Sequence, residues 1–541
     1  MGDRLHASDL RSGAAHYVLE LRFGSRVLYF GHEALNIVRD DGTLIAVRAG
    51  LVSDVEWSAP MEFGSSDVPL QSVPLTLVDP SMDWALEYAA GRDLGFAWGQ
   101  LSQWVSGTTW ETRRVLVGGL IDAPEYGSKG EALAFTLKSH PFEDRAVIPD
   151  GTAVVDATTW PSASDDAMGE AYPEVFGYVG KGSIRYAGSR GLIVDTTNRY
   201  LLIAGHEVDA STVEVLNASK LPTGTWVNRS VTTATDGRGR TVSYVQLQAA
   251  GTGNDADFDE AASFIVSWGH STNGGGRQNQ DRSDAMRSAG EVLRYLLNRT
   301  TLKVDRGRTN AALDLLRGRK LDFAVHEPIG VWELIQGRLL PALPVSIRNG
   351  PEGLYPVVWR YAVDAPVELD LSVGRGEAVR VGPIRTRSTL HGSMANEFRV
   401  AYAVDVMGAS KEQYLLHGDP SIASDATTAT NRACRISRAR AAQATPQITT
   451  AASARLLLDA VWDASTAAAA ANDQAVARAL PVREVTYLIH REHTEIEEGA
   501  PVAITDASLS LSAHRAIVLE VQVQADESRA LTLALMEAAS R

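Results

Sequence analysis

The stretch Trp110–Ser139, WETRRVLVGGLIDAPEYGSKGEALAFTLKS, alternates apolar and polar positions with a period of two. One face of its second half carries Leu133, Phe135 and Leu137. Side chains with this period point to opposite sides of a β-strand. The segment Pro124–Gly130 supplies the residues of a turn. The sequence therefore predicts one long β-hairpin, whose first strand bends or bulges at the adjacent glycines of VLVGGL.

A second alternating stretch, EEGAPVAITDASLSLSAHRAIVLEVQVQADESRALTLALM, lies near the other end of the chain. There the two faces alternate between Val518, Glu520, Gln522 and Gln524 on one side and Ile517, Leu519, Val521 and Val523 on the other. This pattern again predicts antiparallel strands. Two β units, separated by different material, are therefore expected to frame the molecule.

Residues 1–150 are predicted to form the first β unit. Short alternating segments such as HYVLELRF and RVLYF are separated by turn residues, among them Asp40-Asp41-Gly42. One short helical interval is expected over Met82–Ala90, where Trp84 and Tyr88 share a face. Many short strands with frequent turns are typical of a barrel or a sandwich.

Residues 151–270 are predicted to form an inserted small β domain. The domain opens with an irregular segment rich in Pro, Gly, Ser and Asp, and strands such as GLIVD, YLLIAG and VSYVQLQ follow. The run HSTNGGGRQNQDR has no apolar residue and is predicted to be a linker.

Residues 271–382 are predicted to form an α/β domain, because the hydrophobic period changes to that of a helix. Ser283 is the expected N-cap of a helix whose apolar face carries Met286, Ala289, Val292, Leu293, Leu296 and Leu297. Thr309 is expected to cap a second helix through Leu316, and Pro328 to begin a third with Val331, Trp332, Ile335 and Leu339 on its apolar side. LDFAV is expected to be a strand, and PVSIRNG and LYPVVW a hairpin.

Residues 383–541 are predicted to return to β structure and to include one helix. That helix is expected from about Ala451, with Leu457, Leu458, Val461 and Trp462 on its apolar face, and the alanine-rich run after it extends or restarts the helix. Pro481 ends it. The predicted fold class is mainly β with α+β insertions, in which two β-barrel domains accompany a small β domain and an α/β domain.

Composition narrows the class of protein. At 541 residues the chain is too long for one core, and its 45% apolar content is that of a globular protein. No apolar run is long enough to span a membrane as a helix. Cys434 is the single cysteine, which excludes an internal disulfide and a cysteine-built zinc site. The formal net charge of −15 argues against a protein that grips nucleic acid, since such binding needs basic patches.

The segment Gly177–Ser183, GYVGKGS, brings glycines and a lysine together as a phosphate-binding loop does. That loop needs four residues between its first glycine and a Gly-Lys pair, followed directly by Ser or Thr, and it lies between a strand and a helix. The spacing here differs, and neither flanking element is predicted. A turn between strands is the preferred interpretation.

Two further groups resemble metal sites but lack the required spacing. His490 and His493 are three residues apart in a predicted strand, whereas a zinc helix needs two histidines four apart. Asp255, Asp257 and Asp259 alternate as in a calcium loop, but the glycine and the bidentate glutamate of that loop are absent. No metal site is predicted, although an irregular calcium site at the three aspartates stays open.

Catalytic chemistry has little support in the sequence. No Gly-x-Ser-x-Gly nucleophile motif occurs. An acidic run, Glu492, Glu495, Glu497 and Glu498, is interpreted as a charged guard along an exposed sheet edge. We therefore predict that the protein is not an enzyme and has no catalytic, cofactor-binding or metal-ligating residues.

Several segments together resemble one family, the baseplate or tail-tip hub proteins of long-tailed phages and of related contractile or gene-transfer particles. The resemblance is carried by Trp110–Ser139, by GVWELIQGRLLPALPVSIRNGPEGLYPVVW, and by ITTAASARLLLDAVW followed by LPVREVTYLI and EEGAPVAITD. AYPEVFGYV also resembles the opening of the domain inserted in such hubs. The chain departs from the family pattern at Gly499-Ala500, where Gly-Asp is expected.

The resemblance implies a homotrimer in which each subunit carries two tube-like barrels, so that three subunits present six barrels to a six-fold tail tube. It implies a virion structural protein at the tail tip, assembled in the host cytoplasm. The implied partners are the tail tube or distal tail protein, the tape measure protein and the tail fibre or central spike proteins. DNA would leave through the lumen without specific binding, and no cofactor is implied.

Two other functions stay open from the sequence. One is a carbohydrate-active enzyme with two carboxylates across a cleft. The other is a glycan- or receptor-binding module in which Trp160, Tyr172 and Trp226 form an aromatic platform, although core packing is the preferred interpretation of these residues.

Overall fold

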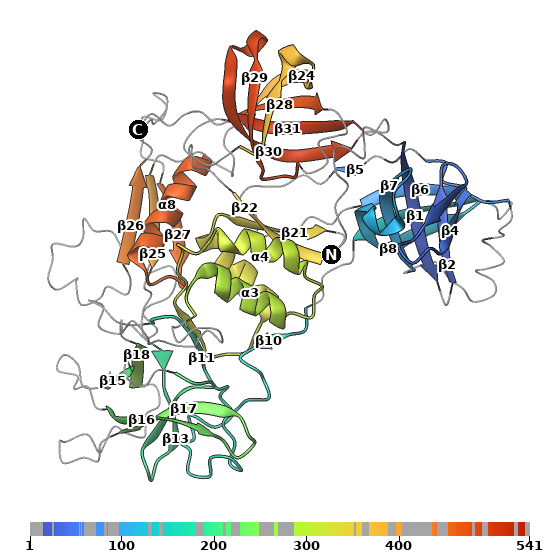
Figure 1. Ribbon diagram of the computed structural model, residues 1–541. Coiled ribbons are helices and arrows are strands. Elements are labelled where there is room, and N and C mark those ends of the chain that lie inside the picture. The colour runs from blue at the N-terminus through green and yellow to red at the C-terminus, as the bar shows by residue number, and fades with distance from the viewer. Residues whose placement is uncertain are drawn as a thin grey trace.

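The protein is mainly β, with several sheets and few helices, which confirms the predicted fold class. The computed structural model describes residues 14–23, 26–53, 55, 57–58, 72–80, 84, 97–127, 132–139, 144–179, 189–208, 213–217, 228–247, 264–268, 286–350, 353–359, 367–387, 397–402, 435–440, 453–478, 482–489, 496–523 and 528–535. Figure 1 shows the first β unit at the right in blue, a second at the top in orange and red, α/β material between, and a further β region below.

The first β unit is an eight-stranded sheet in the spatial order β3-β4-β2-β1-β7-β8-β9-β6. Its strands are β1 Ala15–Phe23, β2 Arg26–Gly31, β3 Leu35–Val38, β4 Leu44–Ala49, β6 Ser72–Val78, β7 Trp98–Val105, β8 Arg114–Tyr126 and β9 Ala132–Ser139. The predicted hairpin is confirmed as β8 and β9, which pair antiparallel. It begins later than predicted, because Trp110–Thr112 forms a 3-10 turn with Trp110 buried.

Hydrogen bonds join β6, at one edge of this sheet, to the residues that follow β4 near the other edge. Leu51, just after β4, forms a bridge with Leu77 of β6. Val52 N donates to Thr76 O at 3.0 Å, and Val78 N donates to Gly50 O at 2.8 Å. The sheet therefore curls back on itself around a buried cluster that includes Leu19, Phe30, Leu75, Trp84, Leu101, Leu133, Phe135 and Leu137.

Trp84 is helical and fully buried, in agreement with the predicted helical interval, while Tyr88 and the rest of Met82–Ala90 lie outside the described residues. Position 119, the second glycine of the pair, has no room for a side chain, because a Cβ there would lie 1.8 Å from Lys138 O of β9. The predicted irregularity is present next to the pair, where the pairing of β7 with β8 shifts at Leu101 and Ser102.

The second β unit is a sheet in the order β23-β29-β30-β31-β28-β24. Its strands are β23 Leu369–Ser372, β24 Ala378–Arg387, β28 Val482–Ile489, β29 Pro501–Asp506, β30 Leu511–Val523 and β31 Arg529–Leu535. The short strand β5, Trp57–Ser58, joins this sheet at the end of β30, although it belongs to the N-terminal part of the chain. The second β unit was predicted to begin at residue 383, whereas β23 and the first residues of β24 come before that position.

The six ring strands of each unit follow one cyclic order. Numbered in chain order, β1, β2, β6, β7, β8 and β9 run 1-4-5-6-3-2 around the first unit, where residues 50–52 lie between strands 3 and 2. The strands β23, β24, β28, β29, β30 and β31 also run 1-4-5-6-3-2. In the second unit strands 1 and 2 are connected by the 3-10 turn Val373–Arg375, where Glu377 N donates to Ser372 O at 3.2 Å.

One strand differs in direction between the units. β1 is antiparallel to β7, whereas its counterpart β23 is parallel to β29. The fifth strand is the longest of each unit, and β8 and β30 each span 13 residues. The two units therefore share one order of six strands, with one strand reversed.

The inserted β domain contains two small sheets. One has the order β12-β18-β15 and the other β13-β14-β17-β16. The strands are β12 Ser189–Arg190, β13 Leu192–Asp195, β14 Tyr200–Ala204, β15 Val213–Asn217, β16 Asn228–Thr235, β17 Thr241–Leu247 and β18 Phe264–Trp268. The predicted strands are confirmed, and the linker at residues 270–282 lies outside the described residues.

The α/β region between the units has one large core. Its helices are α3 Ala289–Arg299, α4 Arg306–Asp314, α5 Val331–Leu334, which continues as a π-helical turn Ile335–Leu339 and a 3-10 turn Leu340–Ala342, and α8 Ala464–Arg478. Its strands are β10 Val147–Ile148, β11 Glu174–Phe176, β19 Phe323–Val325, β20 Ile329–Gly330, β21 Val345–Gly350, β22 Gly353–Val358, β25 Glu397–Tyr402, β26 Arg435–Arg440 and β27 Ser453–Leu458. The apolar face predicted for α3 is confirmed, since all six of its residues are buried.

Three helix predictions need correction. The helix expected from Ala451 is wrong at its start, because residues 453–458 form β27, which pairs parallel with β25. A short apolar run such as ARLLL fits either period, and pairing with β25 decides it. The alanine-rich run does form a helix, α8.

The second helix begins at Arg306, before Thr309, because Asp305 caps it and accepts a hydrogen bond from Arg308 N. The third begins at Val331, since Ile329 and Gly330 after Pro328 form β20. Ser283, the predicted cap of the first helix, lies outside the described residues.

Candidate assembly surfaces and the junctions that support them

The outer face of β24 is open to solvent and apolar. Ala378 points into the core of the second unit, so Val379 and Val381 point outward, and they are 57% and 37% exposed. The pairing with β28 then shifts between Val381 and Arg385, and Ile384 in this bulge is 43% exposed. Gly382 has a φ of +80°, a conformation that glycine adopts without strain.

The neighbouring strand extends this surface. Val379 pairs with Leu488 of β28, and Val381 pairs with Thr486, so these side chains share the outer face. Thr486 Oγ1 lies 3.3 Å from Thr532 Oγ1 of the next strand. The other end of the same outer face is covered by a separate buried cluster of Trp359, Ala477, Val482, Ile517, Leu519 and Ala534. One half of the face is therefore buried inside the molecule and the half at β24 is not.

A second open apolar face lies on the hairpin β3–β4 of the first unit. Val38 and Leu44 are a directly paired cross-strand couple, and they are 46% and 67% exposed. The opposite face of the hairpin is buried in a small cluster of Val18, Ile37, Ile45, Val47, Trp104 and Trp110. The hairpin is thus anchored on one side and presents apolar side chains on the other.

The two open faces carry opposite charges. Arg375 and Arg385 are exposed beside the apolar face of β24. Arg380 pairs with Tyr487 on the opposite face of the strand and lies 3.8 Å from Asp506. The turn of the β3–β4 hairpin carries Asp40 and Asp41, both exposed. The Thr43 side chain and backbone donate hydrogen bonds that lower the pKa of the Asp41 carboxyl. Arg39 in the same turn also lowers the pKa of Asp41.

A buried ion pair fixes the second unit to the α/β region. Arg348 of β21 and Glu498 are 3% and 5% exposed and form a direct hydrogen bond. Glu498 also accepts from Val521 N of β30 at 3.2 Å. Burial lowers the pKa of Arg348. Because both charges are out of water, the pair holds only while the two regions stay together.

A second pair flanks the first. Arg308 of α4 contacts Glu497 at 2.9 Å, and its guanidinium stacks 4.7 Å from the ring centre of Tyr355. The interpretation of the acidic run as an edge guard is therefore wrong for Glu497 and Glu498, because both form ion pairs inside the molecule. Glu492 and Glu495 lie outside the described residues.

Between the two glutamates and the sheet, Gly499 turns the chain. It has a φ of +82°, and a Cβ there would lie 2.4 Å from Val357 Cγ1. The next residue, Ala500, is buried in the core of the second unit. An aspartate at this position would bury a charge.

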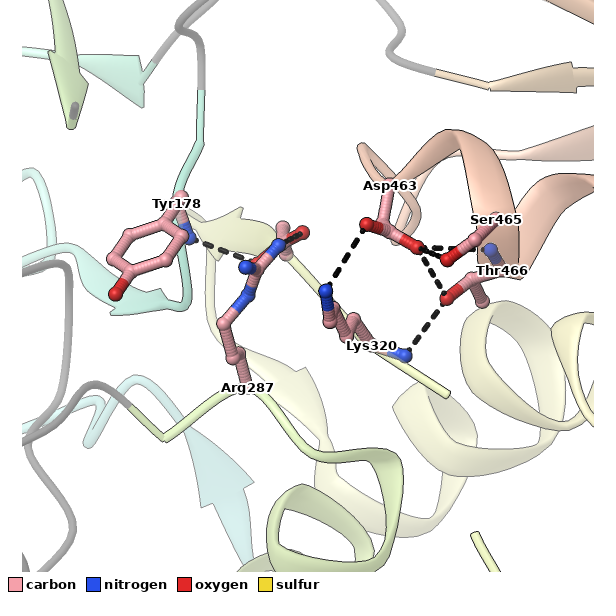
Figure 2. A network of polar contacts seen from close by, with 7 residues as sticks. Tyr178, Arg287, Lys320, Asp463, Ser465 and Thr466 are labelled. Atoms are coloured by element: carbon pink, nitrogen blue, oxygen red, sulfur yellow. Dashed lines mark hydrogen bonds and ion pairs between the residues drawn. The ribbon is translucent and has the colours of Figure 1, made fainter. Parts of the chain in front are cut away.

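A third polar junction links the inserted domain to the α/β region. Asp322 is fully buried and accepts from Tyr178 N at 2.9 Å and from Arg287 Nε and Nη2 at 2.9 and 2.7 Å. Figure 2 shows Arg287 reaching toward Tyr178, whose ring centre lies 4.3 Å from the guanidinium carbon. The segment after β11 is therefore held at the edge of the α/β core.

The same junction continues to the start of α8. Asp463 accepts from Thr466 N at 2.9 Å and lies 3.5 Å from Lys320 Nζ, and Thr466 Oγ1 accepts from Lys320 N at 2.8 Å (Figure 2). Burial raises the pKa of Asp463, but hydrogen bonds from Ser465 and Thr466 outweigh it and bring the pKa to about 2. The carboxylate is thus charged and caps the helix.

The sequence motifs are placed as follows. Gly177 follows β11 with a φ of +67°, and a Cβ there would lie 2.0 Å from Asp322 Oδ1, which accounts for the first glycine of GYVGKGS as a turn residue. The rest of that segment from Gly180 lies outside the described residues, as do Cys434, Asp255, Asp257, Asp259, His490, His493 and Trp226.

Two of the three candidate platform aromatics are described, and they pack internally. Tyr172 is buried; its hydroxyl donates to Asp236 at 3.1 Å and accepts from Trp160 Nε1 at 2.9 Å. Trp160 packs partly buried against the same cluster. Core packing therefore accounts for both.

Across the described ranges, no three His, Cys, Asp or Glu side chains gather as metal ligands would. No helix in that part of the chain is long and apolar enough to cross a membrane.

Sequence reasoning missed the Arg348–Glu498 pair. One signal was present: Arg348 follows Val345 and Ile347 in the predicted strand PVSIRNG, and a charge in a buried strand needs an opposite partner. The identity of the partner, 150 residues away along the chain, had no local signal.

Comparisons with known proteins give distant structural likenesses only. No family model and no curated protein matches the chain. Over 96% of its length the chain resembles the whole of the 43 kDa tail protein of prophage MuSo2 from Shewanella oneidensis, at 8% identity and a TM-score of 0.37. It resembles a tail protein from Neisseria meningitidis over 96% of this chain and 97% of that one, at 9% identity and a TM-score of 0.31. A chain of a native gene transfer agent virion is similar over 69% of this chain and 87% of that one, at 12% identity and a TM-score of 0.38.

Proposed function

We propose that this protein is a virion structural protein, the tail-tip or baseplate hub of a phage-like tail. Three copies form a ring that links the tail tube to the distal tail proteins and fibres and leaves a channel for DNA. The observation that carries the proposal is the shared cyclic strand order of the two β units within one chain.

Two similar units per chain give a threefold assembly six similar ring positions. A ring of three copies then matches a six-membered tube without six copies of one chain, and closed rotational symmetry limits growth. The two units differ in the direction of one strand. In a ring of three copies, first and second units would therefore alternate in a fixed order.

The junctions support a rigid part of such a ring. Arg348–Glu498 fixes the second unit to the α/β region, and β5 pairs with β30 of the second unit. A protein that transmits force between the tail tube and the fibres needs domains that do not move against one another. The net charge of −15 suits a channel that DNA leaves without adhering, because like charges repel.

In this proposal residues 1–150 and 383–541 supply the two tube-like hub domains, with 151–270 and 271–382 between them. The second hub domain also takes β23 and the start of β24 from before residue 383, and β25–β27 and α8 pack in the α/β core. The partners are the tail tube or distal tail protein, the tape measure protein and fibre or spike proteins. The protein acts in the virion after assembly in the host cytoplasm, and it has no catalytic role.

Imaging and labelling test the proposal. Negative-stain images of the purified chain, together with its mass in solution, are expected to show a threefold ring with six peripheral densities. Gold-labelled antibodies are expected to bind one end of the tail on intact particles. A chain absent from particles, or located on the capsid, would contradict the hub role.

A further inference from the structure

We propose that neighbouring copies of this chain join head to tail, with the outer face of β24 in one copy packed on the outer face of the β3–β4 hairpin in the next. The inference rests on the proposed ring and names the surfaces that close it. The partner on each surface is a second copy of this chain.

Both faces leave apolar side chains in water although the rest of each element is well packed. Val379, Val381 and Ile384 are exposed on a strand whose inner side is core, and the pair Val38–Leu44 is exposed on a hairpin whose inner side is also core. Scattered exposed apolar residues are ordinary, but several on one face of an ordered sheet mark a docking surface. Each face thus has the anchored, apolar character of an interface core.

The charges around the faces are complementary. Arg375 and Arg385 are exposed at the β24 face of a chain whose net charge is −15, and Arg385 pairs across the strands with Glu484 of β28. The hairpin turn carries the exposed Asp40 and Asp41, next to Arg39. The two exposed arginines on one face and the two exposed aspartates beside the other favour contact between unlike faces and disfavour contact between two β24 faces.

The contact is heterologous, because two different surfaces meet. Each copy carries one of each surface, so contacts repeat around a ring and close it if the rotation is one-third of a turn. Figure 1 shows β24 in the upper unit and β4 in the separate unit at the right, so the two faces of one copy lie on different units.

Cross-linking tests the contact directly in the full-length protein. In a Cys434→Ser background, Leu44→Cys and Val381→Cys are prepared separately and treated with a short bismaleimide. Neither variant alone is expected to cross-link, because position 44 meets position 381 and not itself. A mixture of the two is expected to give covalent dimers and nothing larger.

The double variant, with both cysteines in one chain, is expected to give covalent dimers and then trimers. Cross-linked dimers in either single variant would overturn the head-to-tail arrangement. Absence of cross-links in both the mixture and the double variant would overturn the contact itself.

Association measured by sedimentation gives an independent test. Val381→Asp with Ile384→Asp, and separately Leu44→Asp, are expected to raise the concentration at half-association by about tenfold or more, because a charge replaces an apolar side chain at a desolvated centre. All three residues are exposed in the single chain, so thermal melting is expected to stay at the wild-type value when it is measured at a concentration at which every variant is monomeric. Leu315→Asp, an exposed apolar position on another surface, is the matched control and should leave association unchanged.

The outcomes separate this inference from the proposed function. Threefold rings at the tail tip, with variants that associate like the wild type, would overturn the named surfaces and leave the hub role standing. Head-to-tail cross-links in a protein that is absent from tails would do the reverse.

Discussion

The first and second β units share a ring order but are completed in different ways. The first unit closes with its own residues, because Leu51 and its neighbours hydrogen-bond to β6 and the β3–β4 hairpin covers one side. The second unit takes support from elsewhere in the chain: Trp359 and Ala477 cover part of its outer face, Arg348 enters beside β30, and β5 lengthens its sheet. The same strand order can therefore be stabilised by the unit's own residues, as in the first unit, or by residues from elsewhere in the chain, as in the second.

The largest expected effect separates the two units by their cores. Leu137 of β9 and Leu533 of β31 are fully buried at the same ring strand. Changing either to Asp buries an unpaired charge and should cost about 4 kcal/mol or more. Leu137→Asp, and likewise Phe135→Asp, should unfold the first unit alone, whereas Leu533→Asp should also loosen α8 and β22. Hydrogen exchange followed by peptide mass measures this.

Thr136→Lys, a charge on the opposite and partly exposed side of β9 that faces Asp122 of β8, is the control and should exchange like the wild type. Normal particle assembly by the Phe135 or Leu137 variant would count against the assignment of that face to the core.

The next effect concerns the dependence of the second unit on its junction. Glu498→Ala leaves Arg348 charged and buried without its partner, which should cost roughly 3–5 kcal/mol. Urea unfolding should show an earlier transition for the second unit and an unchanged one for the first. Glu497→Ala, whose pair with Arg308 is about one-quarter exposed, should cost about 1 kcal/mol or less.

Replacing both charges, Arg348→Met with Glu498→Leu, should recover most of the loss, because an apolar pair of similar volume needs no partner. A double variant as unstable as the single one would show that the pair does more than satisfy two buried charges.

A smaller effect tests close packing in each unit. Gly119→Ala should force β8 from β9 and destabilise the first unit by about 2 kcal/mol, and Gly499→Ala should do the same at the edge of the second. Gly337→Ala has nothing within 4 Å of its Cβ and should be neutral or slightly stabilising. Thermal melting compares the three. Equal stability of all three variants would contradict the close contacts.

The smallest effect reports on neither β unit. Burial lowers the pKa of His326 to about 4, and Arg190 and Arg338 add to the shift. Its Nε2 lies 3.3 Å from Ser189 Oγ of β12, so it joins the inserted domain to the α/β region. The unfolded chain binds a proton near pH 6.5 and the folded chain does not, so stability is full above that pH and falls below it.

Between pH 7 and 5.5 the loss at His326 should be about 1 kcal/mol. Hydrogen exchange at β12 and β19 should rise over this range while β8 and β30 stay protected. His326→Gln should abolish the dependence; a dependence that persists would assign it to another group.

Much of the fold was predictable from local patterns. The β8–β9 hairpin, the apolar face of α3 and the hairpin β21–β22 follow from periodicity and turn residues that act over a few positions. The start of the helix at Ala451 was mispredicted because ARLLL suits either period, and its pairing with β25, about 56 residues earlier, cannot be read locally.

The candidate surfaces were less accessible to sequence reasoning. Exposure of Val381 or Leu44 depends on which face of a strand the rest of the molecule covers, and a strand of alternating residues has two candidate faces. The prediction for Glu497 and Glu498 was wrong because their partners, Arg308 and Arg348, are far away in the sequence. The acidic run alone carries no information about those partners.

The two-residue ladder between Trp57–Ser58 and Gln522–Val523 has a mechanical consequence. A segment from the N-terminal part of the chain pairs with the longest strand of the C-terminal sheet. Any tilt of one unit against the other must therefore first separate these paired residues.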